Sequence, residues 1–186
     1  MTELVSSLNF FLAGGAILLQ LVAVALVVSL LTEKNFLVTE WLSKHAILIS
    51  FLVVLASSAL TLVYSEVFGF VPCGLCWLQR VFLYPQVIIL GIALWKKRRD
   101  VSEYVIGLSI PGAVIALYQH YLQMGGSEFV TCPTAGAGAD CAKRILFEFG
   151  YITFPLMSFS VFAFLIILML LARRTNVAAR SASSTM

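Results

Sequence analysis

Long apolar segments alternate with short polar ones along this chain of 186 residues. The apolar runs cover about residues 10–31, 46–64, 77–95, 104–122 and 152–171. Each run is long enough to cross a bilayer as a helix. Only one polar loop between them is extended, at residues 123–151. The pattern predicts an all-α integral membrane protein with five transmembrane helices.

The first apolar run has a second interpretation, as a cleaved signal peptide. Residues 1–9 contain Glu3 but no Lys or Arg, so the basic segment that opens a signal peptide is missing. The run is also longer than the apolar part of such peptides, and no clear small-x-small cleavage site follows it. We therefore expect residues 10–31 to stay in the protein as a transmembrane helix.

Composition agrees with a membrane protein and argues against a water-soluble core. Hydrophobic residues make up 61% of the chain, charged residues only 11%, and the mean hydropathy is +1.00. Soluble domains are roughly half apolar and a quarter charged. The formal net charge of +3 is too small to suggest a nucleic-acid partner.

Three shorter segments complete the predicted organisation. Residues 32–45 are expected to form a polar loop, and residues 176–186 a disordered tail of small and polar residues. Residues 141–149 mix charged and apolar side chains, which suggests a short amphipathic helix on the membrane surface.

The basic residues are distributed unequally between the two sides that five spans define. One side receives Lys34, Lys44, Lys96, Lys97, Arg98, Arg99, Arg173, Arg174 and Arg180. The other side receives only Lys143 and Arg144, while Arg80 falls within a span. Because Lys and Arg are enriched in cytoplasmic loops, the first side is predicted to be cytoplasmic. All four cysteines then face the extracytoplasmic side, where disulfides can form and persist.

Two of the four cysteines lie three residues apart where the third span begins, in the segment Pro72-Cys73-Gly-Leu-Cys76. Cysteines at this spacing can close a small disulfide, and in a helix they share one face. Unpaired backbone N–H groups and the helix dipole stabilise a thiolate at a helix N-terminus. We predict a redox-active pair in which Cys76 is the favoured thiolate, because it lies further into the first turn.

Arg80 follows Cys76 by four residues, one turn further into the predicted span. An ionisable side chain inside a membrane segment marks a functional site by default, although a long arginine can also extend to lipid headgroups. Beside a dithiol, its guanidinium can stabilise the Cys76 thiolate or hold a carbonyl oxygen of a membrane-borne ligand. Gln79 adds a second polar group on the same turn.

The second pair, Cys132 and Cys141, brackets a small-residue segment in the long loop. Such a loop can deliver its cysteines to another protein or towards Cys73, and it can equally be closed by a structural disulfide. His120 lies near the end of the fourth span. It can hydrogen-bond a ligand at the mouth of the bundle, stabilise a thiolate, or have no task at the interface.

Zinc binding by the four thiols is a further alternative. Such a site would keep all four cysteines reduced. The spacing of Cys132 and Cys141 is unlike that of a zinc knuckle, and an oxidising compartment favours disulfides, so no metal site is predicted.

Four motifs together carry a resemblance to a known family. They are Pro72-Cys-x-x-Cys-Trp-x-Gln-Arg80, Tyr118-Gln-His120, the pair Cys132 and Cys141, and Phe149-Gly-Tyr-Ile-Thr-Phe-Pro155 at the start of the last span. In this order, over about residues 46–172, they resemble the bacterial disulfide bond formation protein B family. The shape is most similar to that of its shorter-loop, BdbC-like members.

The resemblance implies a four-helix bundle, preceded here by one extra N-terminal transmembrane helix, in a bacterial cytoplasmic membrane. It implies a thiol:quinone oxidoreductase that reoxidises a thioredoxin-fold thiol oxidase (DsbA- or BdbD-like) and passes electrons to ubiquinone or menaquinone. Arg80, His120 and Gln79 would line the quinone site.

The resemblance also implies roles for the cysteines. Cys73 and Cys76 would be the quinone-proximal pair, with Cys76 adjoining the quinone. Cys132 would form the mixed disulfide with the partner, and Cys141 would be its loop mate, able to pair with Cys73 during transfer.

Two features depart from the best-known form of the family: the short segment between the loop cysteines and the extra span. The chain would divide into an N-terminal helix and cytoplasmic loop at residues 1–45, the catalytic bundle at 46–172 and a cytoplasmic tail at 173–186.

The vitamin K epoxide reductase family is the nearest alternative. Its loop cysteines precede the C-x-x-C, whereas here they follow it.

Overall fold

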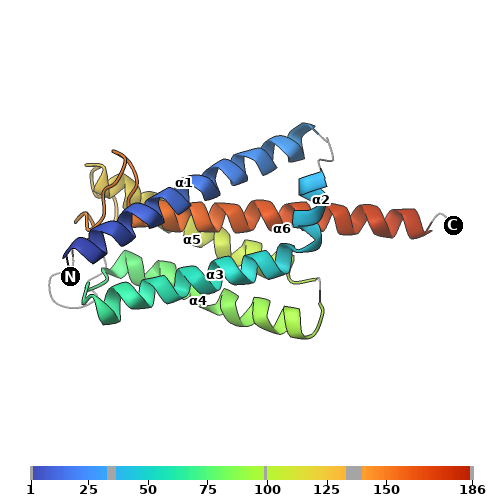
Figure 1. The fold of residues 1–186 in the computed structure, drawn as a ribbon, viewed down its shortest axis with the longest axis horizontal. Coiled ribbons are helices and arrows are strands. Elements are labelled where there is room, and N and C mark those ends of the chain that lie inside the picture. The colour runs from blue at the N-terminus through green and yellow to red at the C-terminus, as the bar shows by residue number, and fades with distance from the viewer. Residues whose placement is uncertain (1, 33–36, 99, 133–139, 185–186) are drawn as a thin grey trace.

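The computed structural model describes residues 2–32, 37–98, 100–132 and 140–184, and their regular structure is helical (Figure 1). The elements are α1 (Thr2–Thr32), α2 (Leu37–Lys44), α3 (Ala46–Leu62), the π-helical segment η1 (Val63–Val67), α4 (Gly74–Trp95), α5 (Ser102–Gln123) and α6 (Phe154–Ser184). One isolated bridge, between Glu148 and Ile152, is the extent of β structure in these ranges.

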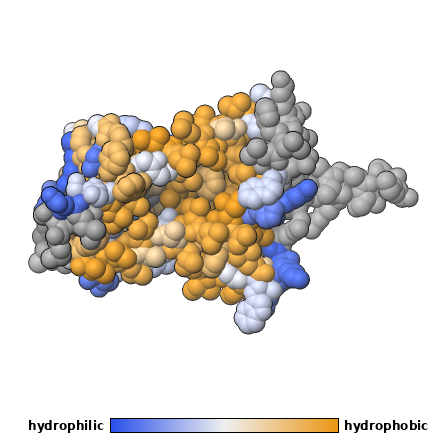
Figure 2. Space-filling view, viewed as in Figure 1, coloured by the Kyte–Doolittle hydropathy of each residue, from blue (hydrophilic) through white to orange (hydrophobic). Residues whose placement is uncertain are grey.

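The predicted fold class is confirmed, because five helices in the described ranges are long and apolar enough to cross a membrane. They are Val5–Thr32, Ala46–Val67, Gly74–Trp95, Ser102–Gln123 and Phe154–Arg174. Figure 2 shows apolar surface over the middle of the molecule and polar surface towards its two ends. An apolar exterior of this kind suits lipid, since every backbone polar group of a spanning helix is bonded within it.

The spans pack around α6, which contacts α1, α3 and α5, while α4 packs between α3 and α5. The centre of the bundle is filled by large apolar side chains without exposed surface, among them Leu90, Val105, Leu165 and Leu168. Small residues let membrane helices approach closely. Gly112 of α5 serves this purpose, since the ring of Phe162 on α6 lies directly against its backbone.

The extra helix α1 is fixed along α6 by apolar and polar contacts. Its buried face carries the small residues Ala13, Ala16 and Ala23. Gln20 Nε2 donates a hydrogen bond to Ser160 Oγ of α6 at 2.8 Å. Towards the N-terminus of α1, the hydroxyl of Tyr64 in η1 donates a hydrogen bond to Asn9 Oδ1. The helix is therefore an integral part of the bundle rather than a tether.

Two predictions about the segments between spans were wrong. The expected loop at residues 32–45 contains the short helix α2, whose residue Leu42 packs against the core of the bundle. The expected amphipathic helix at residues 141–149 is absent from the described structure. There, Phe149 and Gly150 take positive φ angles of 51° and 77°, and the chain turns back to pair with Ile152.

The prediction of a disordered tail at residues 176–186 was also wrong for most of its length. Helix α6 continues without interruption to Ser184. The segment after Arg174 is rich in alanine and contains neither Gly nor Pro, so nothing in it ends the helix.

The two ends of the bundle differ in charge. One end, called the basic end here, carries Lys44, Lys96, Lys97, Arg98, Arg173 and Arg174. The opposite end carries the four cysteines and is called the cysteine end. Lys34 and Arg99 lie outside the described residues, as does the segment 133–139 between the loop cysteines. The unequal distribution of basic residues along the sequence is therefore a difference between the two ends of one bundle.

Replacing Gly112 by Ala is expected to destabilise the bundle. The added Cβ would lie 2.5 Å from the Phe162 ring, so α5 and α6 must separate or the ring must move. Overpacking costs about 1–3 kcal/mol, and the thermal unfolding midpoint in detergent should fall. Gly107→Ala on the same helix is the matched control, since nothing lies within 4 Å of a Cβ there. Equal midpoints for the two variants would contradict the described packing.

Candidate active site

The C-x-x-C segment opens α4 at the cysteine end. Cys73 is the N-cap residue, with extended backbone (φ −73°, ψ 171°), and Cys76 lies in the first helical turn. The N–H of Trp77 donates to Cys73 O at 3.0 Å, which closes that turn. The pair is thus at a helix N-terminus, as the sequence predicts.

The two sulfurs of this pair lie 2.9 Å apart, and both are free thiols. Cys73 is buried and Cys76 is half-buried. The hydrogen bond to Cys76, together with burial, raises the pKa of the Cys73 thiol. The Cys73 thiol is therefore hard to ionise.

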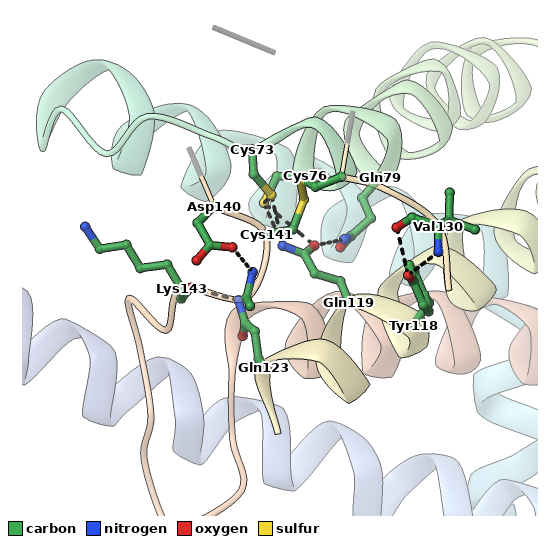
Figure 3. Close-up of a disulfide and its surroundings, with 12 residues drawn as sticks. Cys73, Cys76, Gln79, Tyr118, Gln119, Gln123, Val130, Asp140, Cys141 and Lys143 are labelled. Atoms are coloured by element: carbon green, nitrogen blue, oxygen red, sulfur yellow. Dashed lines mark hydrogen bonds between the residues drawn. A yellow bond between two sulfur atoms is a disulfide. The ribbon is translucent and has the colours of Figure 1, made fainter. Parts of the chain in front are cut away.

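Gln119 of α5 faces both sulfurs (Figure 3). Its Nε2 donates to Cys73 Sγ at 3.0 Å and to Cys76 Sγ at 3.2 Å. Its Oε1 accepts a hydrogen bond from Gln79 Nε2 of α4 at 2.6 Å. Because Gln119 is only 1% exposed, the two amides form a buried bridge between α4 and α5 beside the dithiol.

Gln119 is a residue that the sequence reasoning missed. Its neighbour His120 is the more conspicuous candidate in the sequence, because histidine titrates near neutral pH. The helical period of α5 does identify Gln119 as a buried position. Buried positions recur along this helix at Val105, Ser109, Gly112, Ala116 and Gln119. A polar residue that continues such a series points into the bundle.

Arg80 lies one turn below Cys76 and is 8% exposed. Its guanidinium turns towards α3, where Nη2 donates to the Thr61 carbonyl oxygen at 2.7 Å. It also lies over the ring of Trp77, 5.2 Å from the centroid. Thr61 lies two residues before η1, and π-helical segments are frequent at functional sites.

His120 contacts a different part of the bundle. Its Nδ1 hydrogen-bonds Thr153 Oγ1 at the start of α6, at 2.8 Å. The residue also lines an apolar hollow of about 630 Å³. The other lining residues are Val114, Leu117, Tyr118, Tyr121, Met124 and Phe129. Gln79 thus reaches the dithiol through Gln119. The hydrogen bonds described for Arg80 and His120 go to Thr61 of α3 and to Thr153, just before α6.

The loop cysteines form a disulfide that packs onto the C-x-x-C pair. The Cα atoms of Cys132 and Cys141 lie 6.0 Å apart. Cys141 is fully buried, in one cluster with Cys73, Leu75 and Leu122. Cys132 is half-buried at the edge of the same cluster. The two cysteine pairs are therefore in contact, and Cys132 is the more accessible sulfur of the loop pair.

Tyr118 of α5 holds the chain just before Cys132. Its hydroxyl donates to the Val130 carbonyl oxygen at 3.0 Å. The hydroxyl oxygen of Tyr118 accepts from the backbone N–H groups of Phe129 at 3.2 Å and Val130 at 3.0 Å. One phenol therefore satisfies three backbone groups in a described stretch of the loop, residues 124–132, that forms no strand.

Gln123 of α5 holds the chain just after Cys141. Its Nε2 donates to the Lys143 carbonyl oxygen at 3.1 Å, and the Arg144 guanidinium donates to the Gln123 carbonyl oxygen. Asp140 Oδ1 accepts from the Ala142 N–H at 2.8 Å and stiffens the turn at the disulfide. The last two turns of α5 thus position both cysteine pairs.

This arrangement is suited to thiol–disulfide exchange, which needs an attacking thiolate and a sulfur within reach. A four-thiol zinc site does not match it, because two of the four cysteines are joined to each other. In the described part of the chain, no three His, Cys, Asp or Glu side chains converge on a possible metal position.

A helical membrane bundle with two adjoining cysteine pairs defines a class of membrane protein built for thiol–disulfide chemistry. The family model described as disulfide bond formation protein DsbB matches residues 43–172. The chain belongs to this family, and the prediction from the sequence motifs is confirmed. Helix α1 lies outside the matched residues.

Similar proteins carry names that match this family. Disulfide bond formation protein C of Bacillus subtilis (strain 168) is 36% identical over 124 residues, which cover 67% of this chain and 89% of that protein. The SPbeta prophage-derived disulfide bond formation protein B of the same strain is 42% identical over 125 residues, covering 67% and 82%. A probable disulfide formation protein of Metapseudomonas resinovorans is 34% identical over 135 residues, covering 71% and 92%. No solved structure matches the chain.

Replacing Tyr118 by Phe is expected to loosen the segment that leads to Cys132. The change removes the hydroxyl that bonds Phe129 and Val130. Net loss of one hydrogen bond is about 1 kcal/mol, so amide hydrogen exchange at these residues should speed up about fivefold or more. Tyr104→Phe, at the opposite end of α5, should leave this exchange unchanged. Protection retained in Tyr118→Phe would show that the hydroxyl does not hold the loop.

Proposed function

We propose that this protein is a membrane thiol:quinone oxidoreductase that supports disulfide bond formation. It reoxidises an extracytoplasmic thioredoxin-fold thiol oxidase of the DsbA/BdbD type and passes the electrons to ubiquinone or menaquinone. The observation that carries the proposal is the packing of the Cys132–Cys141 disulfide on the Cys73 and Cys76 thiols. Membership of a disulfide bond formation family supports the oxidising direction.

The proposed orientation follows from charge. The protein lies in a bacterial cytoplasmic membrane. Its basic end is on the cytoplasmic side, because Lys and Arg are enriched in cytoplasmic loops. The cysteine end then faces the oxidising side. Of the two basic residues at that end, Arg144 is engaged by the Gln123 carbonyl oxygen and lies over the Phe147 ring, 4.7 Å from its centroid.

Electrons enter at the loop disulfide. A thiolate of the partner attacks Cys132, the more accessible sulfur, and Cys141 leaves as a thiolate. The second partner thiol then attacks the mixed disulfide. The partner gains a disulfide, and the loop pair gains two electrons and is left reduced.

The contact between the two pairs supports the next step. A Cys141 thiolate attacks Cys73 of an oxidised Cys73–Cys76 pair, and Cys132 resolves the new Cys73–Cys141 bond. The loop disulfide is restored, and Cys73 and Cys76 are left reduced.

Arg80, His120 and Gln79 are the residues that would hold a quinone. A guanidinium carries five N–H donors, and in the described structure Arg80 bonds one carbonyl, that of Thr61, so donors remain for a ligand. A buried positive charge one turn from a dithiol suits a carbonyl oxygen on which negative charge develops. A bound quinone supplies the acceptor for two electrons and two protons. On the protein side, Cys76 carries the negative charge and Cys73 the proton.

The proposal predicts quinone-dependent oxidation of a dithiol partner by the purified protein. With a reduced thioredoxin-fold oxidase and a soluble quinone, quinone absorbance should fall only when both substrates and the protein are present. Cys76→Ser should lower this rate to background, because serine cannot carry the thiolate. Cys132→Ser should give no mixed disulfide with the partner on non-reducing gels.

Three outcomes would separate this proposal from its alternatives. Full quinone turnover by Cys76→Ser would refute the assignment of the electron exit. Stoichiometric zinc with four reduced thiols would indicate a metal-binding protein. A loop disulfide that stays inert to every reduced partner, without quinone binding, would indicate a structural role.

A further inference from the structure

We propose that Gln119 is a further catalytic residue: its carboxamide donates a hydrogen bond to each sulfur of the Cys73 and Cys76 pair and stabilises the thiolate form. The inference rests on the proposed function, since it assigns a task in the electron relay. It also stands on contacts that exist without quinone or partner.

The geometry uses the full donor capacity of the side chain. A carboxamide nitrogen carries two hydrogens, and Gln119 Nε2 lies 3.0 Å from Cys73 Sγ and 3.2 Å from Cys76 Sγ. Gln79 Nε2 donates to the Gln119 oxygen at 2.6 Å, which fixes the carboxamide with its nitrogen nearest the sulfurs. The Gln119 oxygen lies 3.7 Å from Cys76 Sγ, a longer contact than those of the nitrogen. Gln79 is thus a positioning residue for Gln119.

The surroundings increase the effect of these donors. Gln79 and Gln119 are both buried, and hydrogen bonds are electrostatically stronger away from water. A hydrogen bond to a charged acceptor is also about twice as strong as one between neutral groups. The nearby cation, Arg80, donates its hydrogen bond to the Thr61 carbonyl oxygen and acts on Cys76 through its charge. In the described structure, the donor that reaches both sulfurs is therefore the neutral amide of Gln119.

Thiolate stabilisation favours electron transfer into the membrane pair. When the reduced loop pair reduces the Cys73–Cys76 disulfide, that bond breaks and the Cys132–Cys141 bond forms. Two electrons move to the membrane pair; of the two protons of the loop thiols, one passes to Cys73 and the other is released, and Cys76 is left as a thiolate. Donors that stabilise the thiolate move this exchange towards a reduced membrane pair.

Gln119→Leu tests the inference, because it keeps the approximate size of the side chain and removes both donors. The full-length protein in detergent is reacted with iodoacetamide at pH 7, and modified Cys76 is located by peptide mass spectrometry. Loss of one hydrogen bond to a charged sulfur should slow this reaction about tenfold. The equilibrium constant for reduction of the pair by glutathione should fall about tenfold, which equals a potential lower by about 30 mV.

Two further variants sharpen the test. Gln79→Leu should shift both readouts in the same direction but less, because Gln119 loses its orientation and keeps its donors. Gln86→Leu is the control, since Gln86 is another fully buried glutamine of α4 that bonds Phe82 O and Ser109. It lies ten residues beyond Cys76, and both readouts should stay at the wild-type values.

Unchanged alkylation and glutathione equilibrium in Gln119→Leu would overturn the inference. If that variant does not fold, Gln119→Glu replaces it, since a carboxylate accepts from Gln79 but offers the sulfurs no donor; a wild-type alkylation rate in that variant would overturn the inference equally. Neither readout uses quinone or partner. Absence of quinone turnover in the wild-type protein would therefore refute the proposed function without affecting the result for Gln119.

Discussion

The site depends on the way the last two turns of α5 hold two cysteine pairs against each other. Tyr118 and Gln123 bond the backbone on either side of the loop disulfide, and Gln119 between them contacts the sulfurs at the start of α4. A loop without a ladder of its own needs partners for its backbone groups, and this helix end supplies them. Because the loop is held there, the proposed exchange between Cys141 and Cys73 requires no long movement of the chain.

In this bundle, polar side chains near the cysteines also hold the helices together. Helices in lipid gain little from apolar contact alone, so small residues and interhelical hydrogen bonds decide their packing. Gln79 of α4 bonds α5, Arg80 of α4 bonds α3, and Gln20 of α1 bonds α6. Each polar side chain therefore ties two helices together. Those nearest the cysteines are also the groups that we propose act on a thiolate or a quinone, so the same residues would serve packing and reactivity.

Much of this could be predicted from the sequence, because bilayer thickness and apolar length determine a spanning helix almost alone. The four cysteines and Arg80 could be proposed as site residues from the sequence, because two cysteine pairs and an arginine within a span are unusual in a membrane protein. Gln119 was missed because an uncharged amide does not stand out in the sequence. Its contact with the sulfurs depends on which side of α5 faces α4. The packing of Cys141 on Cys73, like the direction of the Arg80 side chain towards α3, depends on tertiary structure that no local pattern encodes. Helix α2 and the end of α6 were missed because polar, helix-compatible segments resemble loops in composition.

The central claim is that the loop pair and the membrane pair form one relay through contact between Cys73 and Cys141. The double variant Cys76→Ser/Cys132→Ser leaves only these two cysteines in the chain. After mild oxidation, non-reducing digestion and peptide mass spectrometry show which sulfurs are joined. The account predicts an intramolecular Cys73–Cys141 disulfide in monomeric protein. Two free thiols, or disulfides formed only between molecules, would contradict it.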